Sequence, residues 1–214
     1  MAEFTLVIGN KNYSSWSMRP WIVMKHIGIE FEEVLIPLYR PQSKAEILKH
    51  SPSGKVPTLI HRGAAIWDSL AICEYLAESF PNAHLWPQDR AARARARSIS
   101  AEMHSGFQNL RQTMGMDLRA SHPDHKPTPE AAADIERIVA IWNGCREEFG
   151  AGGEFLFGSF TIADAMYAPV VTRFTTYGVK LDPVCDRYSR TIWALPATRE
   201  WRDAGIREPW TIEF

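Results

Sequence analysis

The feature that most constrains the fold is a change of pattern around residues 81–89, a segment with two prolines and no apolar periodicity. Before this segment, short apolar runs rich in β-branched residues alternate with apolar residues at helical spacing. After it, the strand signals stop, and apolar residues recur only at steps of three and four. We therefore expect an α/β domain at residues 1–81, a linker at 82–89 and an all-helical domain at 90–214.

The order of elements in the first domain predicts a small four-stranded sheet. A helical crossover joins the first two strands, so they should be parallel. The last two are separated by a short segment containing Gly63, which predicts an antiparallel hairpin. We expect strands at residues 4–8, 31–36, 56–60 and 65–67, and helices around 21–27 and from about 70 to 80.

The second domain is predicted to be a helix bundle. One apolar stripe predicts a helix over residues 91–116, and another predicts a helix around 135–145. A further helix should begin at Thr161, which has with Asp164 the spacing of a reciprocal cap. The first stripe consists of Ile99, Met103, Phe107, Leu110 and Met114.

Charge, apolar runs and cysteines exclude several classes of function. The 214 residues carry a formal net charge of −1, which gives no overall positive field for nucleic acid. No uncharged apolar run approaches the ~18 residues of a membrane span, and residues 1–9 lack the basic start of a secretion signal. The three cysteines have no metal-ligand spacing. We expect a cytoplasmic protein that uses no metal, nucleic acid or membrane.

Hydroxyl groups gather where the first strand gives way to the first helix. Ser14, Ser15 and Ser17 precede Pro20, which has no N–H and is predicted to lie in the opening turn of that helix. The free N–H groups and the dipole of a helix start stabilise an anion such as a phosphate or a thiolate. The alternative is that these serines only cap the helix.

Lys55, Val56 and Pro57 stand at the start of the third strand. Because proline cannot donate to a sheet ladder, it belongs at the first residues of a strand or on an edge, and a cis bond there would turn the preceding main chain outward. The main chain of Val56 would then be open to an extended, peptide-like ligand. The alternative is an edge proline that only discourages aggregation.

Asp68 and Ser69 lie between the fourth strand and the following helix. A serine there is a common N-cap, which is the simpler interpretation. The pair also matches an amino-acid zwitterion, because Ser69 and the helix N–H groups would receive a carboxylate while Asp68 would receive an ammonium group.

Taken in this order, and together with Thr161-Ile-Ala-Asp164, these motifs resemble the cytosolic glutathione transferases over nearly the whole chain. The serines upstream of Arg19 are similar to serine-containing bacterial members and most closely to the Ser-Ser-Cys-Ser stretch of the zeta class, which includes maleylacetoacetate isomerases. Trp16 replaces that cysteine, which argues against cysteine chemistry. The resemblance implies a thioredoxin-like N-terminal domain, an all-α C-terminal helix bundle, a homodimer and glutathione as co-substrate.

The resemblance also implies roles for individual residues. Ser14 aligns with the serine that activates the thiol, and Ser15 is the alternative in the same loop. The main chain of Val56 would pair with the cysteinyl amide, Asp68 with Ser69 would hold the γ-glutamyl end, and lysines would meet the glycyl carboxylate. The residues expected to hold glutathione are Lys44, Lys55, Val56, Pro57, Asp68 and Ser69.

A pocket for the second substrate is expected between the first helix and the C-terminal domain. Part of its expected wall lies on the apolar stripe described above, and such a stripe also fits ordinary core packing. The residues expected to line this pocket are Tyr13, Trp16, Met103, Phe107 and Met114.

We therefore expect a transferase in which a serine hydroxyl activates the glutathione thiol for attack on small hydrophobic electrophiles. A free thiol titrates near ~8.5, and lowering that pKa by about one to two units takes roughly 1.4–2.7 kcal/mol. One hydrogen bond to a charged group supplies about 1.5–3 kcal/mol. The alternatives are a glutathione-dependent isomerase of the maleylacetoacetate type, and a non-catalytic module that binds ligands or proteins through the same scaffold.

Overall fold

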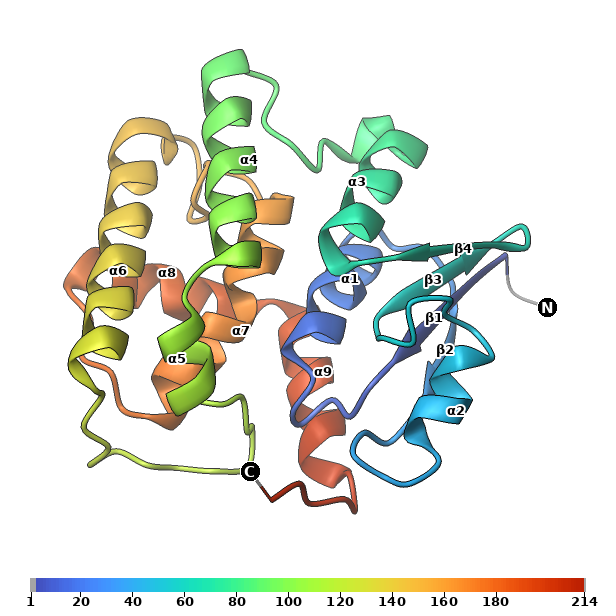
Figure 1. Ribbon diagram of the computed structural model, residues 1–214. Helices are drawn as coiled ribbons and strands as arrows, with labels where there is room; N and C mark the ends of the chain where they lie inside the picture. Colours follow the sequence, from blue (N-terminus) through green and yellow to red (C-terminus); the bar gives the residue numbers. More distant parts are fainter. Residues whose placement is uncertain (1–2, 214) are drawn as a thin grey trace.

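The computed structural model describes residues 3–213 and consists of an α/β half and a helical half (Figure 1). The α/β half comprises β1 (Phe4–Ile8), α1 (Ser15–His26), β2 (Glu32–Leu35), α2 (Ser43–Leu48), β3 (Thr58–His61), β4 (Ala64–Trp67) and α3 (Ser69–Ser79). A 3-10 turn at Pro81–Ala83 leads into the helical half, which comprises α4 (Arg90–Ser105), α5 (Gln108–Thr113), α6 (Pro129–Phe149), α7 (Ile162–Thr176), α8 (Pro183–Ala194) and α9 (Pro196–Arg207).

The four strands form one mixed sheet in the order β2-β1-β3-β4. β1 is parallel to β2, with Val7 opposite Val34, and antiparallel to β3. β3 and β4 form an antiparallel hairpin. The predicted parallel pair and hairpin are therefore confirmed, and the half has the thioredoxin-like fold.

Helices cover both faces of this sheet (Figure 1). Side chains alternate along a strand, so Leu6 and Ile8 join the large core formed with α1 and α3, whereas Val7 faces the other way. Val7 packs in a second, smaller core with Ile36 and with Ile47 of α2. The six residues of α2 are too short to show a helical period, and the sequence did not predict this helix.

The helix predicted over residues 91–116 is wrong, because the chain breaks into α4 and α5. Gly106 is extended, and Phe107 adopts the left-handed conformation with a φ of 55°. The apolar stripe nevertheless remains buried on both sides of the break. The periodicity therefore reports which residues face the core, and it does not report whether the helix is continuous.

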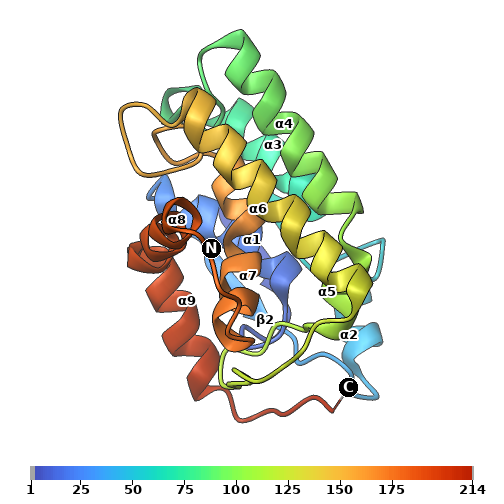
Figure 2. The ribbon, with the colours of Figure 1, turned by 90° about the vertical axis from the view of Figure 1, so that its left-hand side faces the viewer.

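α7 forms the centre of the helical half and packs against both α1 and α4. Its start carries the predicted reciprocal cap, because the carboxylate of Asp164 accepts from the main-chain N–H of Thr161 while the Thr161 side chain accepts from the N–H of Asp164. Figure 2 shows α4 and α6 side by side over α7, and an ion pair between Arg137 and Glu102 joins them.

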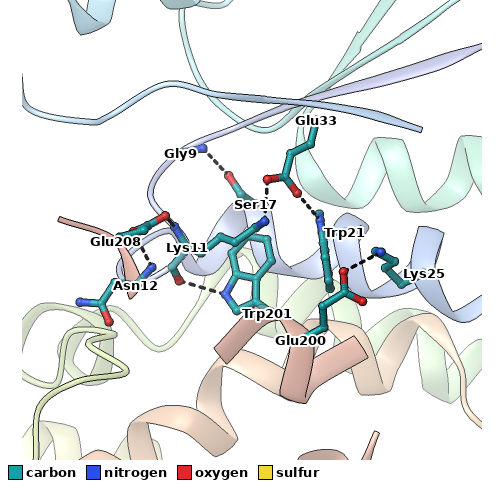
Figure 3. A network of polar contacts seen from close by, with 10 residues as sticks. All are labelled: Gly9, Lys11, Asn12, Ser17, Trp21, Lys25, Glu33, Glu200, Trp201 and Glu208. Atoms are coloured by element: carbon teal, nitrogen blue, oxygen red, sulfur yellow. Dashed lines mark hydrogen bonds and ion pairs between the residues drawn. The ribbon is translucent and has the colours of Figure 1, made fainter. Parts of the chain in front are cut away.

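A polar network around Lys11 joins the two halves (Figure 3). The ammonium group of Lys11 forms an ion pair with Glu33 and lies 5.3 Å and 5.6 Å from the ring centres of Trp21 and Trp201. The indole N–H of Trp201, on α9, donates to the main-chain carbonyl of Lys11 at 2.9 Å. The loop between β1 and α1 is thereby fixed from both sides.

No helix within residues 3–213 combines the length and apolar character needed to cross a membrane. In the same part of the chain, no three His, Cys, Asp or Glu side chains are grouped so that they could hold a metal ion.

Candidate functional site

A cavity of about 940 Å³ opens where the ends of α1, β3 and β4 meet α2, and we refer to it as the sheet-edge cavity. It is bordered mainly by the α/β half, and one residue of α4 completes its wall. The lining residues are Trp16, Leu38, Tyr39, Arg40, Ser43, Lys44, Ile47, Ser53, Gly54, Lys55, Val56, Pro57, Trp67, Asp68, Ser69 and His104. All six residues expected to hold glutathione are therefore brought together in one wall.

The sheet-edge cavity carries charges of both signs. Arg40, Lys44 and Lys55 supply three cationic side chains, and Asp68 supplies a carboxylate. The ammonium group of Lys44 donates to the main-chain carbonyl of Gly54 at 3.1 Å, which fixes the loop before β3. A ligand with carboxylates and an ammonium group would find a complement for each.

The loop before β3 presents unpaired main chain to this cavity. The Val56–Pro57 peptide bond is cis, and Val56 lies just outside the strand ladder. Among the described residues, neither the N–H nor the C=O of Val56 has a hydrogen-bond partner. An extended ligand could therefore pair with both groups in the manner of an added strand.

The start of α3 lies beside this main chain. Asp68, with a φ of 75°, is the N-cap, and its Oδ1 accepts from the N–H of Leu70 at 2.9 Å. The expected serine cap is therefore wrong by one residue. Ser69 is the first helical residue, and its hydroxyl is buried without a partner in the described chain. That hydroxyl and the helix start remain available to an anion.

His104 is the contribution of the helical half, and the sequence did not predict it. Its Nε2 lies 3.2 Å from Oδ2 of Asp68, and its ring meets the indole of Trp16 edge-on at 5.2 Å. Burial lowers the pKa of His104; the Asp68 carboxylate opposes this effect, and Arg19 and Arg111 add to it. The imidazole therefore resists protonation.

The serines at the start of α1 lie next to the cavity but are not part of its lining. Ser14 is the N-cap: its hydroxyl donates to the hydroxyl of Ser17 at 2.7 Å and accepts from the Ser17 N–H. Ser15 is the first helical residue, and Pro20 lies in the interior of α1 rather than in its opening turn as predicted. Since Pro20 has no N–H, the carbonyl of Trp16 loses its helical partner.

Trp16 occupies the cavity wall where the resemblance expects a cysteine. The guanidinium of Arg19 lies 4.2 Å from the centre of the indole ring, and that of Arg111 lies 5.3 Å from it. Within the described chain, the main-chain N–H of Trp16 donates to no acceptor. The wall thus combines a fixed aromatic face with an open N–H at a helix start.

Four of the residues expected at an electrophile pocket are absent from the cavity lining. Met103, Phe107 and Met114 are 0%, 7% and 0% exposed and belong to the hydrophobic core. Tyr13 is also buried, and its hydroxyl accepts from Arg119 at 2.7 Å. Of the five expected residues, the structure brings Trp16 to the cavity.

Two models of known families match the chain. The N-terminal domain of glutathione S-transferase matches residues 13–79, and its C-terminal domain matches residues 91–204. A probable maleylacetoacetate isomerase of Caenorhabditis elegans is 28% identical over 86% of this chain and 85% of its own length. The maleylacetoacetate isomerase of Rattus norvegicus is 32% identical over 79% of this chain and 77% of its own length.

Solved structures agree with the family models. A glutathione transferase homolog from Burkholderia gl BGR1, with bound glutathione, aligns with a TM-score of 0.70 over 94% of this chain and 97% of its own, at 27% identity. This likeness covers both the α/β half and the helical half described above. The chain belongs to the glutathione S-transferase family.

Proposed function

We propose that the protein is a glutathione-dependent transferase that binds glutathione in the sheet-edge cavity. The observation that carries this proposal is the convergence of one open main-chain pair, one unpartnered buried hydroxyl and charges of both signs. The open main-chain pair belongs to Val56, and the buried hydroxyl belongs to Ser69. The cationic groups are Arg40, Lys44 and Lys55, and the anionic group is Asp68. Such a set fits an extended tripeptide with two carboxylates and one ammonium group.

In the proposed binding mode, the main chain of Val56, beside Pro57, pairs with the amide groups around the cysteinyl residue. Asp68 receives the ammonium group of the γ-glutamyl end, and Ser69 with the start of α3 receives its carboxylate. Lys44 and Lys55 are proposed to meet the glycyl carboxylate. The sulfur then lies toward the start of α1.

The proposed chemistry is attack by the glutathione thiolate on a small hydrophobic electrophile. The hydroxyl of Ser14 or Ser15 and the open N–H of Trp16 stabilise the thiolate, as the helix dipole also does. The electrophile is proposed to lie against Trp16 and His104, which are the aromatic groups on that side of the cavity. Met103, Phe107 and Met114 pack in the core, and Tyr13 is buried, so we propose that these four residues support this wall without touching the electrophile.

A second candidate function is glutathione-dependent cis–trans isomerisation. Two relatives that carry the name maleylacetoacetate isomerase, and the Ser14-Ser15-x-Ser17 pattern, favour it. In such a reaction the thiolate adds to a conjugated double bond and leaves after rotation about the resulting single bond. Glutathione is then regenerated rather than consumed.

The test is a titration with glutathione followed by assays of a panel of electrophiles and of maleylacetone. The proposal predicts binding, and product formation with stoichiometric loss of glutathione. Isomerisation of maleylacetone without loss of glutathione would favour the second candidate. Binding without any turnover would instead indicate a non-catalytic module. We also propose that the protein is a homodimer, which a molar mass measured by light scattering tests. Its two proposed domains are residues 1–81 and 90–214, and its proposed location is the cytoplasm.

A further inference from the structure

The hydroxyls of Ser14 and Ser15 differ in how they are already used. Ser14 donates its only hydroxyl proton to the Ser17 hydroxyl at 2.7 Å and caps α1 by accepting from the Ser17 N–H, so its one donor is already in use. Ser15 accepts a hydrogen bond, and within the described chain its own O–H donates to nothing. Ser15 therefore has a proton to offer to a ligand, whereas Ser14 would first have to give up its donation to the Ser17 hydroxyl.

The group that donates to Ser15 is Arg173, which lies on α7 in the helical half. Its Nη2 lies 3.2 Å from the hydroxyl oxygen of Ser15, and its Nε donates to the main-chain carbonyl of Met114 at 2.9 Å. A further hydrogen bond joins Nη1 to the carbonyl of Pro169. Arg173 is 4% exposed, is held by these three hydrogen bonds and in turn fixes the orientation of Ser15.

Arg173 also belongs to a buried cluster of positive charge. Arg19 is 0% exposed, and its Nε and Nη1 have no partner in the described chain. Burial, with the charges of Arg173 and Arg111, lowers the pKa of Arg19 to about 9, and burial with Arg111 lowers that of Arg173 to about 10. Neither Arg19 nor Arg173 forms an ion pair with a carboxylate of residues 3–213. Buried cations without a counter-ion favour the entry of an anion.

We propose that Ser15 is the catalytic hydroxyl that donates to the glutathione sulfur, and that Arg173 is a positioning residue that holds Ser15 for this donation. This inference rests on the proposed function, because it assigns the serine left open there. On binding, the thiol proton leaves to water, Ser15 keeps its own proton, and a sulfur lone pair accepts the Ser15 O–H. Donation from Arg173 polarises this hydroxyl and strengthens it as a donor.

The experiment is an ultraviolet titration of the thiolate in the glutathione complex of the full chain and of its variants. In Ser15→Ala the pKa of the bound thiol should rise by about one unit, which lowers the thiolate fraction at about pH 7 roughly three- to eightfold. Arg173→Met should shift the pKa in the same direction, and Arg173→Lys should give a smaller shift because one ammonium group cannot make the same three contacts. The acid limb of the kcat/KM profile should move with these values.

Ser14→Ala should lower the melting temperature through the lost cap and leave the pKa of the bound thiol in place. The matched control is Arg137→Met, which removes an exposed arginine of α6 paired with Glu102. It should change neither the bound-thiol pKa nor the affinity. A shift in Ser14→Ala without one in Ser15→Ala would overturn the assignment of the serine.

An unchanged thiol pKa in a folded Arg173→Met protein would overturn the positioning role. If Arg173→Met does not fold, Arg173→Lys decides the same point, since an unchanged pKa there overturns the role and a raised pKa supports it. Absence of glutathione binding by the unaltered protein would contradict the proposed function itself. Normal binding with no effect of Ser15 or Arg173 would contradict this inference alone.

Discussion

The imidazole of His104 and the carboxylate of Asp68 meet across the boundary between the two halves of the protein, with Nε2 and Oδ2 3.2 Å apart. Asp68 caps α3 in the α/β half, whereas His104 lies in the last turn of α4. Both side chains line the sheet-edge cavity, so this contact is part of its wall. It makes the stability of the cavity wall depend on the protonation of a histidine.

The stability of the protein should fall on acidification partly because of His104. Burial lowers its pKa in the folded state, so between that value and the ordinary ~6.5 the unfolded chain binds the proton that the folded chain refuses. The contribution of His104 to stability is therefore present above pH ~6.5, and it is lost as the pH falls from there through the lowered pKa of the folded state. Melting temperatures of the unaltered protein and of His104→Asn, measured from about pH 7.5 to about pH 5.5, should converge toward acid.

The control for this series is His84→Asn, which replaces an exposed histidine hydrogen-bonded to Gln88. It should melt in parallel with the unaltered protein at every pH. A His104→Asn variant that loses stability toward acid as steeply as the unaltered protein would contradict the account.

Glutathione affinity should depend on the charge of Asp68. Asp68→Asn removes the proposed partner of the ligand ammonium group, and a charge-assisted hydrogen bond is worth about 1.5–3 kcal/mol, so the dissociation constant should rise roughly 10- to 150-fold. Calorimetric titration measures this change. Asp186→Asn, which changes a half-exposed carboxylate of α8 paired with Arg190, should bind glutathione as the unaltered protein does. Equal affinities in all three proteins would remove Asp68 from the proposed site.

The Lys11 network should contribute to stability without entering the chemistry. Trp201→Phe keeps one buried six-membered ring but removes the N–H that donates to the Lys11 carbonyl, leaving a buried acceptor unsatisfied and a small void. The unsatisfied acceptor alone should cost about 1–3 kcal/mol of unfolding free energy, measured by chemical denaturation, and the void adds to this cost. Trp193→Phe, which removes a solvent-exposed indole bond to Thr175, should cost well under half as much.

The cap of α7 should be among the costliest in the molecule to remove. Asp164 is 0% exposed and accepts from the N–H groups of Leu156 and Thr161 and from the Thr161 hydroxyl. Asp164→Ala leaves these donors buried without an acceptor and should lower the free energy of unfolding, measured by chemical denaturation, by about 2–5 kcal/mol. Asp89→Ala, at the exposed cap of α4, should cost about 1 kcal/mol. Similar losses for the two variants would contradict the role given to burial.

Local sequence patterns predict the fold well where the structural cause is itself local. The strand residues around Val7, the hairpin at Gly63 and the cap at Thr161 each depend on neighbours within a few positions. The helix break at Phe107 was not predictable in this way, because the apolar period continues through it to keep Met103 and Met114 in the core. Packing, rather than helix continuity, sets that period.

In the candidate site, too, residues placed by local patterns were predictable from the sequence, and residues placed by long-range packing were not. Val56, Asp68 and Ser69 follow from strand and helix starts, and all of them reach the sheet-edge cavity. His104 and Arg173 come from the other half of the chain, and the bond between Arg173 and Ser15 spans 158 positions. A single sequence gives no signal for such a contact, because neither His104 nor Arg173 belongs to a recognisable local motif.

The most direct test of the account is the pH titration of thiolate absorbance for glutathione bound to the unaltered protein. We expect saturable binding and a bound-thiol pKa about one to two units below the ~8.5 of the free thiol, owing to a serine hydroxyl, an open N–H and the start of α1. A bound thiol that titrates as it does in water, or no saturable complex at all, would contradict it.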